Sequence, residues 1–89
     1  MTYRLQISDD VKKQLKKMDK HVGLMLAKDM KKRLDGLSNP RQIGKALLGP
    51  YKGLWRYRVG NYRVICQIID DQLLVLALEV GHRKEIYKR

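Results

Sequence analysis

The chain has few acidic residues, a single cysteine and no long apolar run, and each shortage narrows what the protein can be. Nine Asp and Glu residues stand against 20 Lys and Arg residues, which gives a formal net charge of +11. One cysteine excludes an internal disulfide and suits a reducing compartment. The longest apolar run, Leu73 to Leu78, is far too short to cross a bilayer, and no signal peptide is recognisable. We therefore expect a cytoplasmic protein with no membrane partner.

Length and charge together predict one small domain with a polyanionic partner. We expect residues 1–89 to form a single domain with a thin core, because the sequence shows no repeat, linker or low-complexity tract. The excess of cations favours a nucleic acid, an anionic membrane or an acidic protein as the partner. The alternative is that the lysines form only a solvated outer surface.

Hydrophobic periodicity predicts a strand and two helices in the first part of the chain. Apolar and polar residues alternate in residues 3–7, which is typical of a strand. Ser8, followed by two aspartates, has the pattern of a helix N-cap. Apolar residues then recur at helical spacing between residues 11 and 37, and a break at residues 19–23 predicts a helical hairpin.

The second half of the chain predicts three strands joined by tight turns. A glycine-rich connection at residues 41–53 precedes apparent strands at 54–59, 62–69 and 73–80. Gly60-Asn61 suits a two-residue hairpin turn with glycine at its first position. The order β-α-α-β-β-β predicts an α+β fold, with an N-terminal strand, a two-helix hairpin and a mostly antiparallel sheet that the helices cover on one face.

The hairpin turn also predicts where the arginines lie. If Gly60-Asn61 forms the turn, Arg58 pairs with Arg63 on the next strand, and Arg56 shares their face. Two directly opposed arginines destabilise a sheet by roughly a few tenths of a kcal/mol. A phosphate bound across the pair explains it more simply than an ion pair of one arginine with Glu79 or with a terminal carboxylate, because guanidinium groups match phosphate oxygens bidentately. We therefore predict a phosphate site on this face.

Motifs for metal or covalent chemistry are absent from the sequence. His21 and His82 are far apart, and the acidic residues are scattered. We expect Cys66 to be buried on the apolar face beneath the helices rather than to act as a nucleophile. There is no phosphate loop, dinucleotide fingerprint or nucleophile elbow. We expect neither a metal nor a cofactor.

From Lys52 to Tyr87 the chain interleaves cations with aromatic rings that can stack on bases, which indicates RNA or DNA. Cleavage of RNA by its own 2′-OH needs no metal. It needs a proton acceptor, cations around the phosphorus and an acid for the 5′ oxygen. The residues that meet these needs are Lys52, Arg56, Arg58, Arg63, His82, Arg83 and Tyr87.

Two segments carry a resemblance to a known family: LWRYRVGNYRVI at residues 54–65, and VGHR at 80–83 with Ile86-Tyr87 close behind. With them, nearly the whole chain resembles the RelE toxins of bacterial and archaeal toxin–antitoxin pairs, within the RelE/ParE superfamily. The resemblance implies a ribosome-dependent endoribonuclease that cuts mRNA in the A site without a metal and inhibits translation. It also implies a RelB-like antitoxin, acidic in its toxin-binding part, which wraps the toxin and masks its basic face.

The resemblance also assigns roles by motif. It places active residues at Arg56, Arg63, Arg83 and Tyr87. It implies that Arg63 steadies the transition-state phosphate and Arg83 serves the leaving oxygen. Tyr87 would then stack on the nucleotide or orient it.

One departure from the family leaves the proton acceptor open. The RelE pattern has two lysines on the second strand, where this chain has Leu54 and Arg56. Lys52, Arg56 and His82 therefore remain candidates, and we expect Lys52 and Arg58 to bind RNA. Two alternatives to the ribonuclease remain: a ParE-like toxin that inhibits gyrase, and a non-enzymatic relative that binds RNA or titrates an antitoxin.

Overall fold

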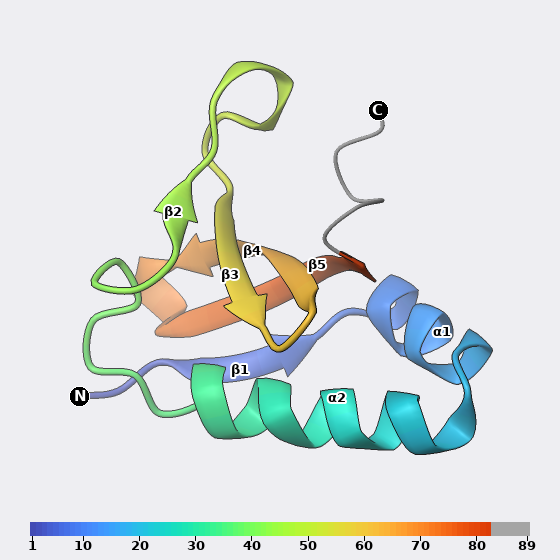
Figure 1. The fold of residues 1–89 in the computed structure, drawn as a ribbon. Helices are drawn as coiled ribbons and strands as arrows, with labels where there is room; N and C mark the ends of the chain where they lie inside the picture. Colours follow the sequence, from blue (N-terminus) through green and yellow to red (C-terminus); the bar gives the residue numbers. More distant parts are fainter. Residues whose placement is uncertain (83–89) are drawn as a thin grey trace.

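The structure, a computed structural model, describes residues 1–82, in which two helices cover one face of a five-stranded sheet (Figure 1). The elements in chain order are β1 (Arg4–Ile7), α1 (Asp9–Lys17), α2 (Lys20–Leu34), β2 (Lys45–Ala46), the short 3₁₀ helix η1 (Gly49–Tyr51), β3 (Trp55–Val59), β4 (Tyr62–Ile69), the 3₁₀ helix η2 (Asp70–Gln72) and β5 (Leu74–His82). The strands lie in the order β1-β5-β4-β3-β2; β1 is parallel to β5 and the other pairs are antiparallel. The predicted α+β fold is confirmed, and β2 is an additional strand that the sequence did not predict.

The two helices begin at side-chain caps and pack closely. Ser8 Oγ accepts a hydrogen bond from the backbone N–H of Val11 at 3.3 Å, as the sequence predicts. Asp19 caps α2 in the same way, so the hairpin turn ends before Lys20 and the predicted break at residues 19–23 is too long. A side chain at Gly23 would meet a backbone oxygen of α1 at 2.6 Å, which explains why glycine stands inside this helix.

The β3–β4 hairpin has the register that the sequence predicts. Gly60 adopts a φ of +59° in the turn, and Arg58 lies directly opposite Arg63. Cys66 is buried as expected, and that burial raises the pKa of its thiol to about 12. The buried core between the sheet and the helices consists of Val11, Leu26, Met30, Leu34, Tyr57, Val59, Val64, Cys66, Val75, Ala77 and Val80.

A bulge in β5 changes which of its side chains face the helices. Ile65 of β4 pairs with Glu79, but the next residue, Cys66, pairs with Ala77, so Leu78 is an extra residue in β5. An extra residue reverses the alternation of side chains beyond it. Glu79 therefore lies on the face that the helices do not cover.

The segment between α2 and β2 is fastened to β3 by two aromatic side chains. The hydroxyl of Tyr57 donates a hydrogen bond to the carbonyl of Pro40 at 2.6 Å, and the indole N–H of Trp55 donates to the carbonyl of Ile43 at 2.8 Å. Tyr57 is fully buried, and that burial raises the pKa of its hydroxyl well above the ordinary value. The hydroxyl therefore stays protonated and remains a donor.

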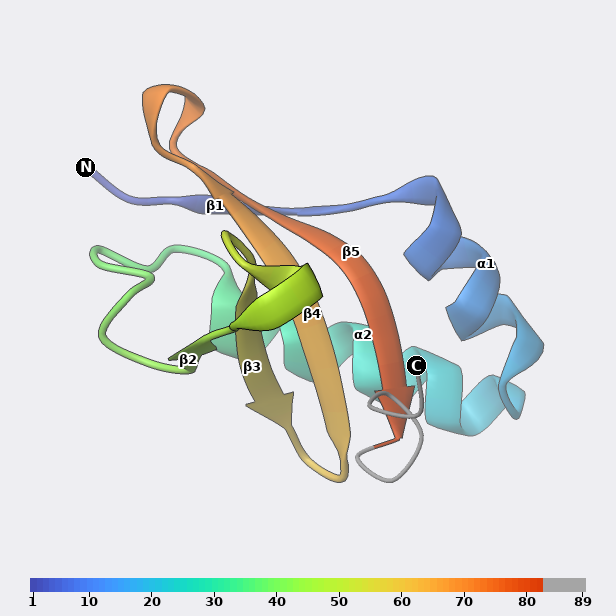
Figure 2. The same ribbon diagram turned by 90° about the horizontal axis from the view of Figure 1, so that it is seen from above.

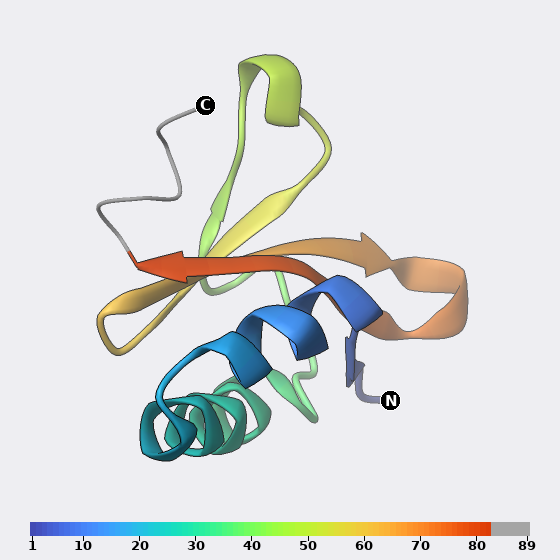
Figure 3. The same ribbon diagram turned by 90° about the vertical axis from the view of Figure 1, so that its right-hand side faces the viewer.

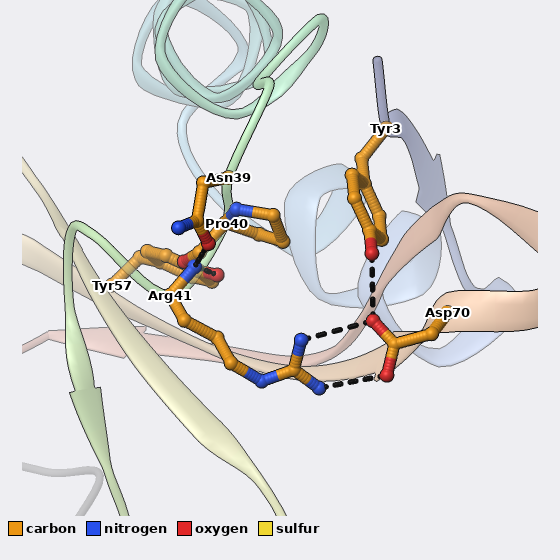
Figure 4. Close-up of polar contacts among 6 residues, drawn as sticks. All are labelled: Tyr3, Asn39, Pro40, Arg41, Tyr57 and Asp70. Carbon is orange, nitrogen blue, oxygen red and sulfur yellow. Dashed lines mark hydrogen bonds and ion pairs between the residues drawn. The ribbon is translucent and has the colours of Figure 1, made fainter. Parts of the chain in front are cut away.

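Asp70 joins three segments of the chain that are distant in sequence. Its carboxylate accepts two hydrogen bonds from the guanidinium of Arg41, both at 2.9 Å, and one from the hydroxyl of Tyr3 at 2.7 Å (Figure 4). The hydrogen bonds from Arg41, and then the one from Tyr3, lower the pKa of Asp70 to about 2. A carboxylate whose pKa is lower in the folded protein stabilises the fold above its unfolded pKa of about 3.9 and loses that effect as the pH falls toward the folded value.

Asp70→Asn is therefore expected to lower the free energy of unfolding at neutral pH. The loss should be modest, because the side chains of Arg41 and Asp70 are 45% and 57% exposed. The difference from the wild type should shrink as the pH falls from about 4 to about 2, since the wild-type carboxylate then becomes protonated. Urea denaturation across this pH range measures the difference in the free energy of unfolding. Asp71→Asn is the control that should leave stability unchanged. A difference that stayed constant with pH would contradict the assignment.

The two faces of the sheet differ in what covers them. Both helices lie on one side, and residues 47–54, here called the arm, rise from the other side with η1 at their centre (Figure 3). A hydrogen bond from Leu47 N–H to the Leu54 carbonyl, 3.0 Å long, closes the base of the arm. The side without helices is called the open face, and Figure 2 looks onto it with η1 in front of the strands. Within residues 1–82, neither helix is long and apolar enough to span a membrane.

Candidate functional site

The open face carries the three arginines that the sequence groups together. Arg58 and Arg63 occupy directly opposed positions, where Cβ atoms are about 5 Å apart. Arg56 lies two residues away along β3, at about 7 Å, and pairs on its other side with Lys45 of β2. Arg58 is exposed, whereas Arg56 and Arg63 are half-buried. The predicted sharing of one face by these arginines is confirmed.

A hollow of about 510 Å³, here called the sheet basin, lies on the open face between α1 and the arm. Ile65 and Glu79, which pair across β4 and β5, contribute to its floor, and Tyr51 of the arm contributes to its wall. Lys13 and Lys17 line it from α1. The basin therefore combines an aromatic ring, two ammonium groups and the carboxyl groups of Asp10 and Glu79.

A smaller hollow of about 230 Å³, here called the edge pocket, lies beside β3 at the point where β2 begins. Its lining residues are Arg33, Ile43, Gly44, Lys45, Arg56, Tyr57, Arg58 and Arg63. Five of these eight residues are cations and none is acidic. A concave site lined by one sign of charge attracts counter-ions more strongly than a flat surface does.

Two predicted site residues lie apart from the arginines. His82 pairs with Tyr62, and the two rings meet edge to face with their centroids 5.7 Å apart. Tyr62 packs against the core beneath the sheet, so His82 lies on the helix side, across the sheet from Arg63. Lys52 follows η1 in the arm and does not extend β3, which begins at Trp55. Lys52 would share the arginine face only if β3 extended back to residue 52, and β3 does not extend that far.

Arg83 and Tyr87 lie outside the described residues, so their places in the site remain predictions. Two other cations, Arg33 and Lys45, line the edge pocket. The sequence did not predict that either belongs to the site. A signal existed for Arg33, since it is the one cation at a position of the apolar stripe of α2. Among residues 1–82, no group of three His, Cys, Asp or Glu side chains is placed to hold a metal ion.

A third hollow, here called the helix groove, lies on the far side of the molecule between α1 and α2. It measures about 530 Å³, and its apolar lining comes from Ile7, Leu15, Met18, Leu24 and Ala27. Three lysines, Lys12, Lys16 and Lys20, stand at its margins. Leu24 is 65% exposed, so a large apolar side chain here lies open to solvent. Exposed apolar patches rimmed by polar residues mark interaction surfaces.

Known proteins share both the sequence pattern and the fold. Residues 5–87 match the family model described as the ParE toxin of the type II toxin–antitoxin system parDE. A RelE-like toxin protein of Escherichia coli is 30% identical over 84 residues, which cover 94% of this chain and 86% of that protein. Toxin RelG of Mycobacterium tuberculosis is 38% identical over 50 residues, 56% of this chain and 58% of RelG.

The solved structures that resemble this one include toxins bound to antitoxins. The toxin–antitoxin complex RelBE2 of Mycobacterium tuberculosis contains a chain with a TM-score of 0.80 and 24% identity, over 96% of this chain and 95% of the other. The RelE–RelB complex of the archaeon Pyrococcus horikoshii contains one with a TM-score of 0.57 and 26% identity, over 96% and 99%. With a family model that matches almost from end to end, a 30% identical toxin and this shared fold, the chain belongs to the RelE/ParE superfamily and is a RelE-like toxin of a toxin–antitoxin system.

Proposed function

We propose that this toxin is a ribosome-dependent endoribonuclease that cuts mRNA in the A site and so inhibits translation. The observation that carries the proposal is the pair Arg58 and Arg63, side by side on the open face with Arg56 next to them. A phosphate bound between the two guanidinium groups would interact favourably with both charges. Two guanidinium forks also match phosphate oxygens in geometry. We also propose that the toxin acts in the cytoplasm, on message held in the A site of the ribosome.

The chemistry is attack by the RNA on itself. The 2′ oxygen bonds to the adjacent phosphorus, the bond to the 5′ oxygen breaks, and the proton lost by the 2′-OH is matched by one delivered to the leaving oxygen. Arg58 and Arg63 stabilise the extra negative charge of the five-coordinate phosphorus. Of the three candidates for proton acceptor, Arg56 lies beside the arginine pair, whereas Lys52 is in the arm and His82 is on the helix side. Arg83 for the leaving oxygen and Tyr87 for the nucleotide remain proposals from the sequence motif.

A translating extract tests the ribonuclease directly. The toxin is added to a message that is translated and to the same message held free of ribosomes, and the new 5′ ends are mapped. Cuts that keep a constant phase relative to codons, and that appear only on translated message, would support the proposal. Intact message in an extract whose translation the toxin has stopped would contradict it.

The main alternative is inhibition of DNA gyrase, because the matched family model is described as a ParE toxin. Such a toxin acts on a protein and has no need of a paired arginine site for phosphate. Loss of supercoiling activity by purified gyrase, with message left intact, would favour this alternative. Absence of toxicity together with RNA binding would instead indicate a non-enzymatic relative that binds RNA or titrates an antitoxin.

The toxin's partner is a RelB-like antitoxin, as the related complexes indicate. We propose that part of this antitoxin is an amphipathic acidic helix that lies in the helix groove. The groove supplies an apolar floor, and its marginal lysines complement acidic side chains on the flank of such a helix. An acidic antitoxin would also neutralise part of the net charge of +11.

Leu24→Ser is expected to weaken antitoxin binding by roughly 5- to 30-fold, as the loss of an apolar anchor does in other interfaces. Met25→Ser is the matched control: Met25 is the next residue and 51% exposed, but it does not line the groove. Isothermal titration with the antitoxin encoded beside the toxin gene measures both. Equal affinity for the two variants would show that the antitoxin lies elsewhere.

A further inference from the structure

We propose that the edge pocket is a second phosphate-binding site, in which Arg33 and Lys45 hold a backbone phosphate of single-stranded RNA next to the one bound at Arg58 and Arg63. The inference rests on the proposed function for the identity of its ligand. It extends the RNA-binding surface beyond the sheet, because Arg33 belongs to α2 and Lys45 to β2.

Three elements bring these cations together at one place. β2 pairs only with Trp55 and Arg56, so the sheet ends beside the rest of β3 and leaves a hollow there. Lys45 closes one side of that hollow, and Arg33, in the last turn of α2, reaches it from beneath. The arginines of β3 and β4 complete the wall. Elements that are distant in sequence thus place cations around one small volume.

A structural explanation accounts for Arg33 only in part. Cations in the last turn of a helix interact favourably with its dipole, and α2 carries Lys31, Lys32 and Arg33 there. Any of the three would serve the dipole equally, but Arg33 is the one that lines the edge pocket. Lys45 is not in a helix and has no such explanation. Arg33 and Lys45 bring positive charge into one hollow, and a bound anion would interact favourably with both.

The size and position of the pocket suit a phosphodiester. A volume of about 230 Å³ exceeds several times the roughly 30 Å³ that a water molecule occupies in the liquid, so a phosphate fits with part of its hydration. The row of Lys45 and Arg56 lies two residues along β3 from the row of Arg58 and Arg63, about 7 Å away. An RNA strand that crosses the open face therefore meets two cationic rows in succession and reaches Arg33 at the edge of the sheet.

Binding of a short single-stranded 2′-O-methyl oligonucleotide tests the proposal, because such RNA cannot be cut by its own 2′-OH. Affinity is measured by fluorescence anisotropy at several salt concentrations. Arg33→Gln and Lys45→Gln are each expected to weaken binding roughly fivefold and to reduce the slope of log affinity against log salt by about 0.7. Lys32→Gln removes the same charge from the same turn of α2 outside the pocket, and its slope should equal that of the wild type. Equal slopes for all three variants would overturn the proposal.

Competition with inorganic phosphate shows whether the ligand of the edge pocket is RNA or a free anion. Phosphate is titrated into the complex of the protein with the oligonucleotide. Displacement no stronger than that of chloride at equal ionic strength supports RNA. Displacement by low phosphate concentrations that Arg33→Gln abolishes would show a site for free phosphate and overturn the assignment to RNA. Because the oligonucleotide is not cleaved, failure here leaves the ribonuclease test in the extract unaffected, and failure in the extract leaves this measurement unaffected.

Discussion

Arg63→Ala is expected to abolish detectable cleavage of translated message while the protein stays folded. Arg63 lies opposite Arg58, where the two guanidinium groups can hold the oxygens of one phosphate. Removal of one preorganised donor to a transition-state charge lowers a rate by about 10²- to 10³-fold. Arg63 is half-buried and lies outside the buried core, so the free energy of unfolding should change by no more than about 1 kcal/mol.

Cleavage is measured by primer extension on message recovered from the extract, and stability by urea denaturation. Arg63→Lys keeps the charge without the bidentate fork, and an intermediate rate is expected. Arg4→Ala is the control, because Arg4 is exposed on β1 at the opposite edge of the sheet and should be dispensable. Wild-type cleavage by Arg63→Ala would show that the phosphate is held elsewhere.

The part of the site that the sequence predicted follows from short-range rules. A glycine at the first position of a two-residue turn fixes the hairpin register, and the period of two along each strand then assigns every side chain to a face. Gly60 has the required positive φ, and Arg58 and Arg63 are opposed as expected. Ser8 caps α1 for the same kind of local reason.

The position of His82 depends on a feature that short-range rules do not give. Uninterrupted alternation along β5 would place Glu79 beneath the helices and His82 among the arginines. The bulge at Leu78 reverses both placements. The bulge lies next to a contact with another element: just beyond it, the side chain of Gln14 in α1 accepts a hydrogen bond from Val80 N–H at 3.0 Å. The sequence of β5 alone does not contain this information.

The edge pocket was missed because its residues come together only in the folded chain. β2 is two residues long and both are exposed, so it has no periodicity to detect. Arg33 is separated from the arginines of β3 and β4 by the whole connection that contains β2. In the sequence, Gly44 was only one of several glycines in that connection. In the structure it is the residue that allows the connection to press against β3.

Gly44→Ala is expected to lower the free energy of unfolding by roughly 2–5 kcal/mol, through backbone strain and overpacking together. Gly44 has a φ of +76°, and a Cβ there would collide with the carbonyl oxygen of Arg56. It would also lie 2.7 Å from a ring carbon of Tyr57 and 2.9 Å from one of Trp55. Neither ring can retreat at low cost, because each donates a hydrogen bond to the same connection, Tyr57 through its hydroxyl and Trp55 through its indole N–H.

Gly36→Ala separates the collision from the strain. Gly36 has a similar φ of +82°, but a Cβ there would meet nothing within 4 Å, so only the strain of about 1–2 kcal/mol is expected. Urea denaturation followed by the fluorescence of Trp55, the only tryptophan, measures both variants. Equal midpoints would show that the connection does not press on β3.

If Gly44→Ala is the less stable protein, its folded molecules must hold the connection away from β3. Lys45 belongs to that connection and would then leave the edge pocket. RNA affinity should then fall in Gly44→Ala but not in Gly36→Ala, which ties the packing of one glycine to the binding surface.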